Sequence, residues 1–598
     1  MTVSTRLHRV LLLNTALLAA AVAGPAPAQD FQRIAPKELP PNPELQSLPP
    51  PALPAARRGG GDVLLPALKG VSFVPHADQI LPGGVPRDGI DTGRIDVLDE
   101  TAFRALVAPY LGQPLTRDRL NEIVSLTVVY FREHDHPLVD VIVPKQDITN
   151  GTVQILVMEF TAGTIRTEGN QWFSDDLLLA GIRTHRGDRI RSSTLLDDVN
   201  ALNQNPFRRV DLVYQRGERV GESDIVLRTV DRFPLRVYTG FENTGTPASG
   251  TGRLMAGFNW GNVFGLGHML NYQITGSSDA LPWRSKPDAE GRPDEPRYLA
   301  HSGSYTAPLP WGDRVNLFGA YSRTVPTLAD SLNMTGISWQ VGARYTAPLP
   351  RMGDYRHEMS LGTDFKRTNN NLDFGGTRIY GNHIDIAQGV AEYTGRLPDA
   401  WGSTGLSLSV IASPGGVTPG NTRDAFTGGG GRDGSRPHYY YGRLGFDRQV
   451  TLPYGFGLSA RGQAQIASAP LQSSEQLGIG GASTVRGYKE RAANGDSGLL
   501  LSTEVLLPDI GIAGLLPGQA GIGDSLRPHL FFDTGRVSNR TDVGGQARSV
   551  TLSSVGAGFR YALESYVSAS FDYGVQLRPV SAGAPRDRMV HLAVVLGL

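Results

Sequence analysis

The chain has 598 residues, and its 57 lysines and arginines are balanced by 57 aspartates and glutamates. Zero net charge, with no long basic cluster, argues against a nucleic-acid partner. The sequence contains no cysteine, which excludes disulfides, thiolate nucleophiles, iron–sulfur clusters and zinc ribbons.

The N-terminus has the pattern of a secretory signal. Arg6, His8 and Arg9 precede an apolar run of 14 residues from Val10 to Ala23, and Ala26-Pro27-Ala28 offers small residues for cleavage. A retained membrane anchor is the alternative, but a helix needs about 20 apolar residues to cross a bilayer. We therefore predict a signal peptide over residues 1–28 and an exported mature chain.

A proline-rich stretch follows. Eight prolines lie between Pro36 and Pro54, and Gly59-Gly60-Gly61 comes after them. Such a stretch cannot keep the hydrogen bonds of a helix, so it predicts an extended tether. We assign residues 29–66 to this linker.

Two successive segments share one predicted topology, in the order strand, helix, helix, strand, strand. In residues 67–160 the strands are 71–74, 139–143 and 152–160, and the helices lie around 103–111 and after Thr116. In residues 161–231 the strands are 164–166, 210–214 and 225–230, and the helices are 174–182 and 194–202. An internal repeat of this size indicates an interaction arm.

Strict alternation of apolar and polar residues begins after Arg232. It is clearest from Val567 to Leu577 and recurs over 315–321, 458–466 and 592–598. The hexapeptide Tyr305 to Pro310 returns at Tyr345 to Pro350, a spacing of 40 residues, which suggests about 20 residues for each strand with its connection. The 367 residues after Asp231 would then hold about 18 strands of the ~10 residues typical of a membrane barrel.

The connections favour a membrane barrel over a soluble β-sandwich. Short turns such as 308–313 alternate with long polar loops such as 276–296 and 427–437. Aromatic residues such as Tyr238, Trp260 and Trp311 stand near the expected strand ends, as in the girdles at membrane interfaces. The polar faces of the strands predict a polar lumen.

Two motifs stand out within this part of the chain. Val485-Arg486-Gly487-Tyr488 lies in a loop between two predicted strands, and Phe531-Phe532-Asp533-Thr534-Gly535 lies on a later strand. The largely apolar set of Leu530, Phe532 and Thr534 should face lipid. Phe531, Asp533 and Gly535 should therefore face the lumen.

A loop that folds back into the lumen could bring Arg486 against Asp533. A guanidinium–carboxylate pair shielded from water is one of the stronger directional contacts in proteins. Gly487 would allow a close approach to the wall, and Tyr488 could pack a ring and bond through its hydroxyl. Glu504, on the lumen side with Ser502, is a second candidate partner. In the alternative, Arg486 is a solvated loop charge and Asp533 an ordinary lumen residue.

With these motifs, the chain from about residue 65 to its end resembles the two-partner-secretion B transporters, the haemolysin and filamentous-haemagglutinin secretion/activation proteins of the POTRA-barrel outer-membrane superfamily. The resemblance implies a β-dominated fold, in which two periplasmic α/β POTRA domains, 67–160 and 161–231, precede a 16-stranded antiparallel transmembrane β-barrel over 232–598 with a pore loop at 467–498. It also implies that the loop motif contacts the Asp533 strand. The family often has a helical plug, for which Gln29 to Ala35 are too few residues.

The resemblance also implies a function. The chain would be an outer-membrane translocase that exports a large β-rich passenger protein, captured unfolded by the POTRA domains in the periplasm. The implied partners are this passenger, outer-membrane lipid, periplasmic chaperones and the barrel assembly machinery, with no nucleic acid, cofactor or metal. The alternatives are a barrel assembly or insertion factor and a passive porin or receptor.

Three short patterns resemble parts of enzyme sites. Gly495-Asp496-Ser497-Gly498 is followed by Leu499 where a serine-protease motif continues with glycine, and His357-Glu358 lacks the second histidine of a zinc motif. The neighbours His134, Asp135 and His136 cannot all face one ion. We therefore expect no enzyme activity, with an outer-membrane hydrolase as the least favoured alternative.

Overall fold

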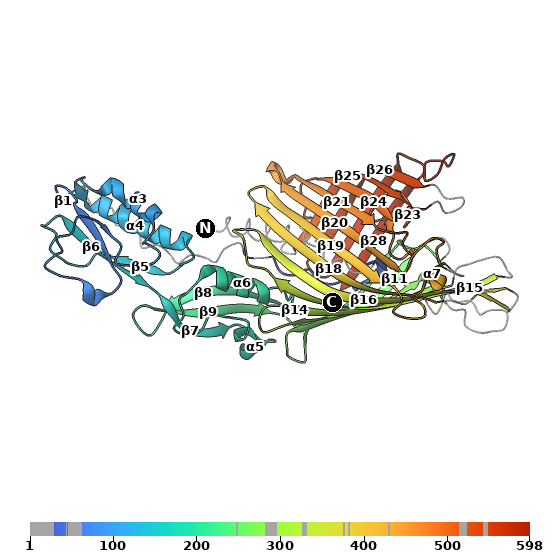
Figure 1. Cartoon of the computed structure of the whole chain (residues 1–598), viewed down its shortest axis with the longest axis horizontal. Coiled ribbons are helices and arrows are strands. Elements are labelled where there is room, and N and C mark those ends of the chain that lie inside the picture. Colours follow the sequence, from blue (N-terminus) through green and yellow to red (C-terminus); the bar gives the residue numbers. More distant parts are fainter. Residues whose placement is uncertain are drawn as a thin grey trace. The chain divides into compact units, whose positions relative to one another are not determined.

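The computed structural model describes residues 29–43, 45, 62–246, 249–280, 296–325, 332–374, 377–380, 383–427, 431–512, 523–541 and 548–598. The predicted signal peptide lies outside the described residues. The chain forms two compact units, Pro41–Phe233 and a second unit that joins Pro234–Leu598 to the residues up to Pro40 (Figure 1). Among the described residues, no helix is both long and apolar enough to cross a bilayer.

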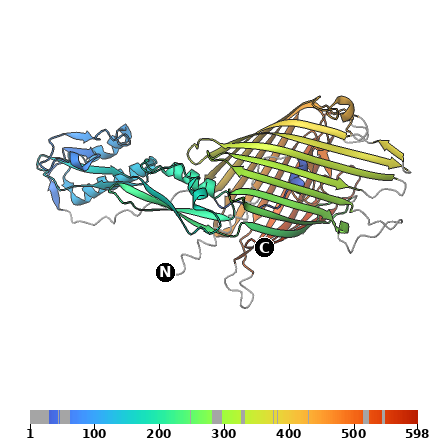
Figure 2. The same cartoon turned by 90° about the horizontal axis from the view of Figure 1, so that it is seen from below.

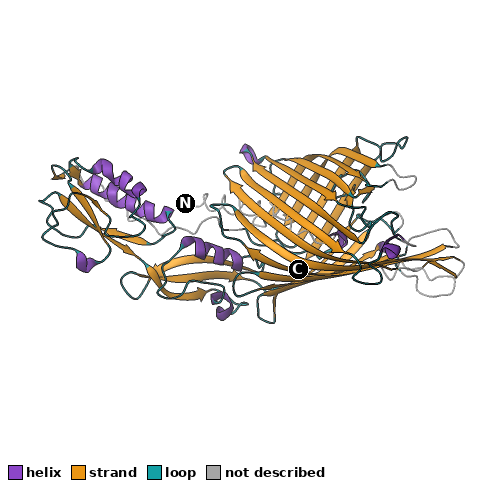
Figure 3. Ribbon diagram, viewed as in Figure 1, coloured by secondary structure: helices purple, strands orange, loops and turns teal. Residues whose placement is uncertain are grey.

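The first module of unit Pro41–Phe233 is a four-stranded sheet in the order β3-β2-β6-β5. Helices α3 and α4 lie on one face of it (Figure 3). The side chains of Phe73, Phe103 and Phe131 are fully buried between the two layers. Thr116 caps α4, as its pattern predicts, because its hydroxyl oxygen accepts a hydrogen bond from the Arg119 N–H at 3.2 Å. The elements are β1 (Val63–Leu65), β2 (Gly70–Val74), η1 (Ala77–Gln79), β3 (Gly89–Asp91), α3 (Thr101–Val107), η2 (Ala108–Tyr110), β4 (Leu115–Thr116), α4 (Arg117–Glu133), β5 (Val139–Ile142) and β6 (Thr152–Glu159).

Three short strands of this module were not predicted. Strand β3 pairs in parallel with β2, and β1 pairs with β4. Elements of two or three residues are too short to show a period, so the sequence pattern could not reveal them. Because β1 starts at Val63, the ordered module begins within the residues that we assigned to the linker.

The second module has the predicted order of elements. Its sheet runs β7-β9-β8, and Ser174 caps α5 by accepting from the Leu177 N–H at 3.3 Å. The elements are β7 (Thr161–Glu168), α5 (Asp175–Leu179), α6 (Ser192–Leu202), β8 (Arg208–Arg216) and β9 (Glu222–Asp231).

Asp135 of the first module caps α6 of the second. Its carboxylate accepts hydrogen bonds from the Ser193 N–H at 2.6 Å and from the hydroxyls of Ser192 and Ser193 at 2.7 and 2.6 Å. Burial would raise the pKa of Asp135, but the hydrogen bonds from these serines hold it below its usual value. This carboxylate, one of three neighbours that we weighed as metal ligands, therefore connects the two modules.

The strands after Pro234 form a closed antiparallel barrel, in which β28 pairs with β10 (Figure 1). Sixteen strands make the wall when β17, which precedes β18 in the chain and pairs with the same strand β16, is counted with β18. They are β10 (Leu235–Glu242), β11 (Arg253–Val263), β12 (His268–Ser277), β13 (Tyr298–Pro308), β14 (Arg314–Thr324), β15 (Leu332–Pro348), β16 (Arg356–Phe374), β17 (Thr377–Tyr380), β18 (His383–Asp399), β19 (Gly402–Pro414), β20 (His438–Thr451), β21 (Gly457–Ala467), β24 (Ser497–Leu506), β25 (Asp524–Ser538), β26 (Ser549–Leu563), β27 (Val567–Gln576) and β28 (Arg588–Gly597). Short helices η3 (Ser278–Ala280), α7 (Arg423–Thr427) and η4 (Pro453–Gly455) lie in the connections.

The predicted fold class is confirmed, but the count of about 18 strands from sequence spacing is wrong. Strands such as β16, with 19 residues, and β25 and β26, with 15 each, are much longer than the assumed ten. The short turns fall where the repeated hexapeptide predicted them, between β13 and β14 and between β15 and β16.

The two faces of the barrel wall differ as expected. Apolar side chains such as Leu317, Leu458 and Leu530 are exposed on the outside, whereas polar side chains such as Gln273 and Gln465 are buried inside. One prediction about the aromatic girdle is wrong, because Tyr238 is buried and faces the lumen. Successive side chains of a strand point to opposite faces of the sheet, so one residue of β10 can face the lumen while its neighbour faces lipid.

The residues from Gln29 to Pro40 pack inside the barrel, where Figure 2 shows their blue helix among the strands. They include the six-residue helix α2 (Gln29–Ile34). The Phe31 ring lies 4.8 Å from that of Phe318 on β14, and the Lys37 ammonium lies 3.1 Å from the Glu242 carboxylate on β10. We call residues 29–40 the lumen segment. We had assigned the residues of the lumen segment to the linker. Its helix α2 has only six residues, fewer than a full plug helix would need.

Candidate functional site in the barrel lumen

The connection between β21 and β24, residues 468–496, folds back into the barrel. We call it the lumen loop. A small hairpin of β22 (Leu477–Ile479) and β23 (Ala493–Gly495) shapes it. At its tip Val485, Arg486 and Tyr488 are buried, with exposed fractions of 0, 3 and 0%. The loop charge is therefore withdrawn from solvent.

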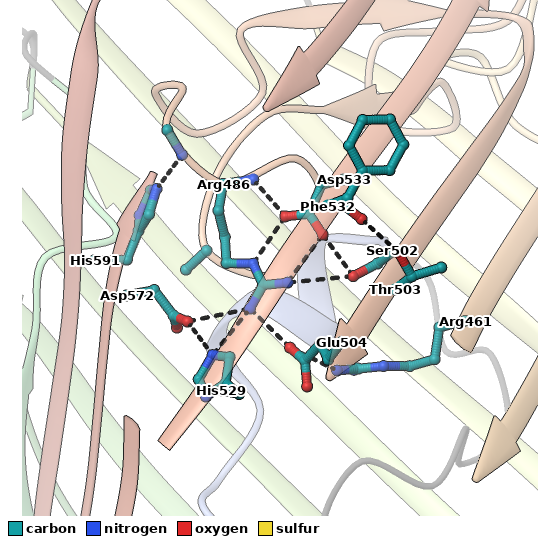
Figure 4. A network of polar contacts seen from close by, with 12 residues as sticks. Arg461, Arg486, Ser502, Thr503, Glu504, His529, Phe532, Asp533, Asp572 and His591 are labelled. Atoms are coloured by element: carbon teal, nitrogen blue, oxygen red, sulfur yellow. Dashed lines mark hydrogen bonds and ion pairs between the residues drawn. The ribbon is translucent and has the colours of Figure 1, made fainter. Parts of the chain in front are cut away.

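Arg486 forms a bidentate pair with Asp533 of β25 (Figure 4). Its Nε donates to Oδ2 at 2.8 Å and its Nη2 to Oδ1 at 2.9 Å. The Arg486 main-chain N–H also donates to Oδ2 at 3.1 Å. Ser502, the cross-strand neighbour of Asp533, donates to Oδ1 at 2.6 Å. One carboxylate thus fixes both the side chain and the backbone of the loop tip.

Two further carboxylates surround the same guanidinium. Nη1 of Arg486 lies 2.7 Å from the Glu504 carboxylate and 3.1 Å from that of Asp572 on β27. The guanidinium carbon also stands 3.6 Å from the centre of the Phe531 ring, a cation–π contact. Three acidic groups and one aromatic face therefore hold a single buried cation.

Other basic groups balance this acidic cluster. Arg560 of β26 donates to Glu504 at 3.0 Å. His529 lies 2.7 Å from the Asp572 carboxylate, and Arg461 stands 4.0 Å from Glu504 at its outer edge. The charges of the site are paired with one another. This arrangement suits holding the loop in place more than catalysing a reaction.

The backbone of the loop tip is fixed as well. The Gly487 N–H donates to His591 of β28 at 3.1 Å, and Gln576 of β27 donates to the Gly487 carbonyl at 2.8 Å. Gly487 has a φ of 86°, and a Cβ on Gly574 would lie 2.5 Å from the Gly487 nitrogen. Tyr488 hydrogen-bonds through its hydroxyl to the Ser553 carbonyl at 2.8 Å. The loop tip therefore packs directly against the main chain of β27, where Gly574 has no side chain.

Two glycines on β26 leave space on the barrel wall for the side chains of this network. A Cβ on Gly556 would lie 2.4 Å from the Phe531 ring. A Cβ on Gly558 would lie 2.5 Å from the Asp572 carboxylate and 2.9 Å from His529. The side chains of β25 and β27 can therefore meet across β26 only because these positions carry no side chain.

The base of the lumen loop has its own anchors. Glu475 pairs with Lys366 of β16 and accepts from the Tyr441 hydroxyl of β20 at 2.8 Å. Asp496 is fully buried and pairs with Arg432 at 2.7 Å. Asp496 belongs to the sequence that resembles a protease motif. Its buried pair with Arg432 gives it a structural role. Among the described residues, no group of three acidic or histidine side chains could hold a metal ion.

The structure brings together all the residues that the sequence singled out. Arg486 meets Asp533, Phe531 and Glu504, and Gly535 lies under the loop, where a Cβ would stand 3.3 Å from Val485. The sequence reasoning missed Asp572, His529, Arg560 and His591. A signal for one of them existed, because Phe571-Asp572-Tyr573-Gly574 repeats the pattern of Phe532-Asp533-Thr534-Gly535.

Comparison with known proteins identifies the family. A model described as haemolysin secretion/activation protein ShlB/FhaC/HecB matches residues 221–561, more than half of the chain. The chain belongs to this family. A second model, the POTRA domain of ShlB type, matches residues 85–159, within the first module. The ShlB/FhaC/HecB family consists of secretion channels, and the predicted protein-secretion function and outer-membrane location are confirmed.

Individual relatives agree with this family membership. The heme/hemopexin transporter protein HuxB of Haemophilus influenzae strain KW20 Rd is 23% identical over 495 residues, covering 80% of this chain and 82% of HuxB. The outer membrane transporter CdiB of Escherichia coli is 23% identical over 416 residues, covering 67% of this chain and 65% of CdiB. A solved structure of Escherichia coli CdiB has the same fold, with a TM-score of 0.70 and 18% identity over 100% of this chain and 98% of that one.

Proposed function

We propose that this transporter exports one large, β-rich, haemolysin- or haemagglutinin-like passenger protein by two-partner secretion. The modules at 67–160 and 161–231 act as two POTRA domains that capture the unfolded passenger in the periplasm, by adding its strand to a sheet edge. Periplasmic chaperones and the barrel assembly machinery bring the transporter to the membrane. The sequence has no Gly-x-x-x-x-Gly-Lys phosphate loop, so folding of the passenger outside the cell supplies the direction.

The single observation that carries the mechanism is the buried attachment of the lumen loop. Arg486 holds the tip to Asp533 through contacts of 2.8 and 2.9 Å, which keep the loop inside the barrel. Charged pairs of this kind can exchange partners without breaking covalent bonds. The loop therefore shifts along the wall during export and returns afterwards.

Alanine substitutions at Arg486 and Asp533 test this mechanism. The assay measures export of the candidate passenger, a large secreted protein to be sought among the products of the neighbouring genes. Heat-modifiable migration of the transporter in gel electrophoresis reports whether the barrel is inserted. We expect export to be lost in both variants while the barrel stays folded.

Arg461→Ala is the matched control, because Arg461 reaches Glu504 only at 4.0 Å and is partly exposed. Normal export in both the Arg486 and the Asp533 variants would contradict the mechanism. Ion conductance with no effect on any secreted protein would favour the porin alternative. Loss of other barrels from the membrane would favour an assembly factor.

A further inference from the structure

Three buried asparagines lie at the end of helix α6 and in the turn that leads to strand β8. Asn200, Asn203 and Asn205 have exposed fractions of 7, 3 and 3%. The Asn203 side chain donates to the Val210 carbonyl at 2.9 Å and accepts from the Val210 N–H at 2.7 Å. Asn205 accepts from the Phe207 N–H at 3.1 Å. These bonds fix the turn that follows α6, and we call this site the asparagine groove.

The fixed turn points three main-chain carbonyls at one place. The Asn42 side-chain amide donates to the carbonyls of Asn203, Asn205 and Arg208 at 3.3, 3.1 and 2.6 Å. The Asn42 main-chain N–H also donates to the Asn203 carbonyl at 3.3 Å. The cluster of acceptors is satisfied by a residue more than 150 positions earlier in the chain.

Asn200 binds the same segment three residues further along the chain, at Leu45. Its Oδ1 accepts from the Leu45 N–H at 2.8 Å, and its Nδ2 donates to the Leu45 carbonyl at 3.1 Å. The side-chain amide thus pairs with both backbone groups of one residue, as a neighbouring strand would. Pro41 and Pro43 flank Asn42 and favour an extended backbone.

The chemistry of the groove defines what it can bind. Converging carbonyls require a donor with two N–H groups and no negative charge, which an asparagine amide supplies and an aspartate does not. Asn200 requires a free N–H and C=O three residues later, whatever the side chain there. The groove therefore recognises an extended peptide by one asparagine and one backbone position.

We propose that the asparagine groove is the receptor for an extended, asparagine-bearing segment of the passenger, and that the linker occupies it in cis until the passenger displaces it. The passenger part rests on the proposed function. The competition has a consequence along the chain, because Asn42 follows Glu38 of the lumen segment by only four residues. Glu38 is held by Asn271 and Ser304 at 3.0 and 2.7 Å. Displacing Asn42 therefore removes an anchor that lies four residues after Glu38 of the lumen segment.

A peptide-binding experiment on the full-length protein in detergent tests the groove. The probe is a fluorescent peptide with the sequence of residues 38–47, and anisotropy measures its affinity. A tethered linker competes at an effective concentration on the order of millimolar. We expect weak binding to the wild type, at least about tenfold tighter binding to Asn42→Ala because its own linker is weakened, and no binding to Asn42→Ala/Asn200→Ala.

Two controls keep the outcome decisive. Asn170→Ala is the matched control, because the Asn170 amide also donates to a main-chain carbonyl, that of Phe173, but outside the groove. A probe with aspartate in place of its asparagine should not bind any variant, which tests the groove even where Asn200→Ala unfolds α6. Equal probe affinity for wild type and Asn42→Ala, or binding of the aspartate probe, would overturn the proposal.

Export of the secreted protein separates this inference from the proposed function. We expect Asn200→Ala to reduce export and the control Asn170→Ala to preserve it. Loss of probe binding with unchanged export in Asn200→Ala would refute the passenger's use of the groove. That result would leave the Arg486 experiment to judge the proposed function.

Discussion

The three carboxylates around Arg486 should contribute unequally to holding the lumen loop. Replacing Asp533 by asparagine keeps the shape of the side chain and removes its charge. We expect this change to release the loop tip more than Glu504→Gln or Asp572→Asn. The order follows from how many hydrogen bonds each carboxylate receives from the loop.

The magnitude can be worked out from the contacts. Asp533 accepts three hydrogen bonds from Arg486, at 2.8, 2.9 and 3.1 Å, whereas Glu504 and Asp572 accept one each, at 2.7 and 3.1 Å. A hydrogen bond to a charged group contributes about 1.5–3 kcal/mol. Because asparagine can still accept one bond, Asp533→Asn should cost about 3 kcal/mol, roughly 100-fold in the loop-release equilibrium. Glu504→Gln should cost about 1.5 kcal/mol, roughly tenfold.

The absence of cysteine from the chain makes the assay simple. A single Val485→Cys substitution places a thiol at a position with an exposed fraction of 0%. Its rate of reaction with a maleimide then reports how often the loop tip leaves the wall. Each carboxylate variant is compared with Val485→Cys alone. Equal rates for the Asp533 and Glu504 variants, or no acceleration by Asp533→Asn, would refute the reasoning.

Two further predictions concern the backbone contact of the loop and the link between the modules. Gly574→Ala should expose the same thiol, because its Cβ would lie 2.5 Å from the Gly487 nitrogen and neither backbone can yield. Asp135→Ala should destabilise the start of α6 by about 1 kcal/mol through loss of its cap, measured by hydrogen exchange. Since the pKa of Asp135 is lowered in the folded state, its contribution is complete above the unfolded pKa of about 3.9 and is lost as the pH falls below it.

Matched variants check both predictions. Gly389→Ala alters another strand glycine, whose Cβ would meet no atom within 4 Å, and should leave labelling unchanged. Asp135→Asn keeps an acceptor without the charge, so it should retain part of the cap and lose the acid sensitivity. Rapid labelling in Gly389→Ala, or acid sensitivity that persists in Asp135→Asn, would count against these explanations.

Much of the fold could be read from local patterns in the sequence. Alternating strands predicted which face of β25 and β27 meets the lumen, and Thr116 and Ser174 marked the starts of α4 and α5. These features depend on neighbours within a few residues. The number of strands did not follow, because strand length in a barrel depends on how far the wall extends beyond the membrane.

The full set of charges around Arg486 could not be derived in the same way. Alternation placed Asp572 on the lumen face, but only the closed barrel brings β27 to the loop tip. The contact also depends on Gly558, which lets His529 and Asp572 meet across β26. Register across three strands decides such contacts, and the sequence of one strand does not contain it.

The path of the linker was hidden for another reason. A run of prolines correctly indicates an extended chain, but an extended chain can still dock through its backbone and through single side chains. Asn42 and Lys37 both do so, with partners that lie 161 or more residues away along the chain. Composition therefore predicted the conformation of this segment and not its contacts.

Two pieces of chain lie inside the lumen and are bonded to different parts of the wall. The hydrogen bonds of the lumen segment reach β10, β12 and β13, whereas the loop tip is bonded to β24, β25, β27 and β28. Arg33 of the lumen segment and Glu490 of the lumen loop interact electrostatically, but the Phe31 ring contact and the Asp533 pair involve neither residue and share no partner, so these two contacts should act independently. Phe31→Ala removes a buried ring and Asp533→Asn weakens the loop, so each should raise single-channel conductance in planar bilayers. The free-energy effects of the two changes on opening should add to within about 0.5 kcal/mol in the double variant. A large departure from additivity would show that the segment and the loop leave the lumen together.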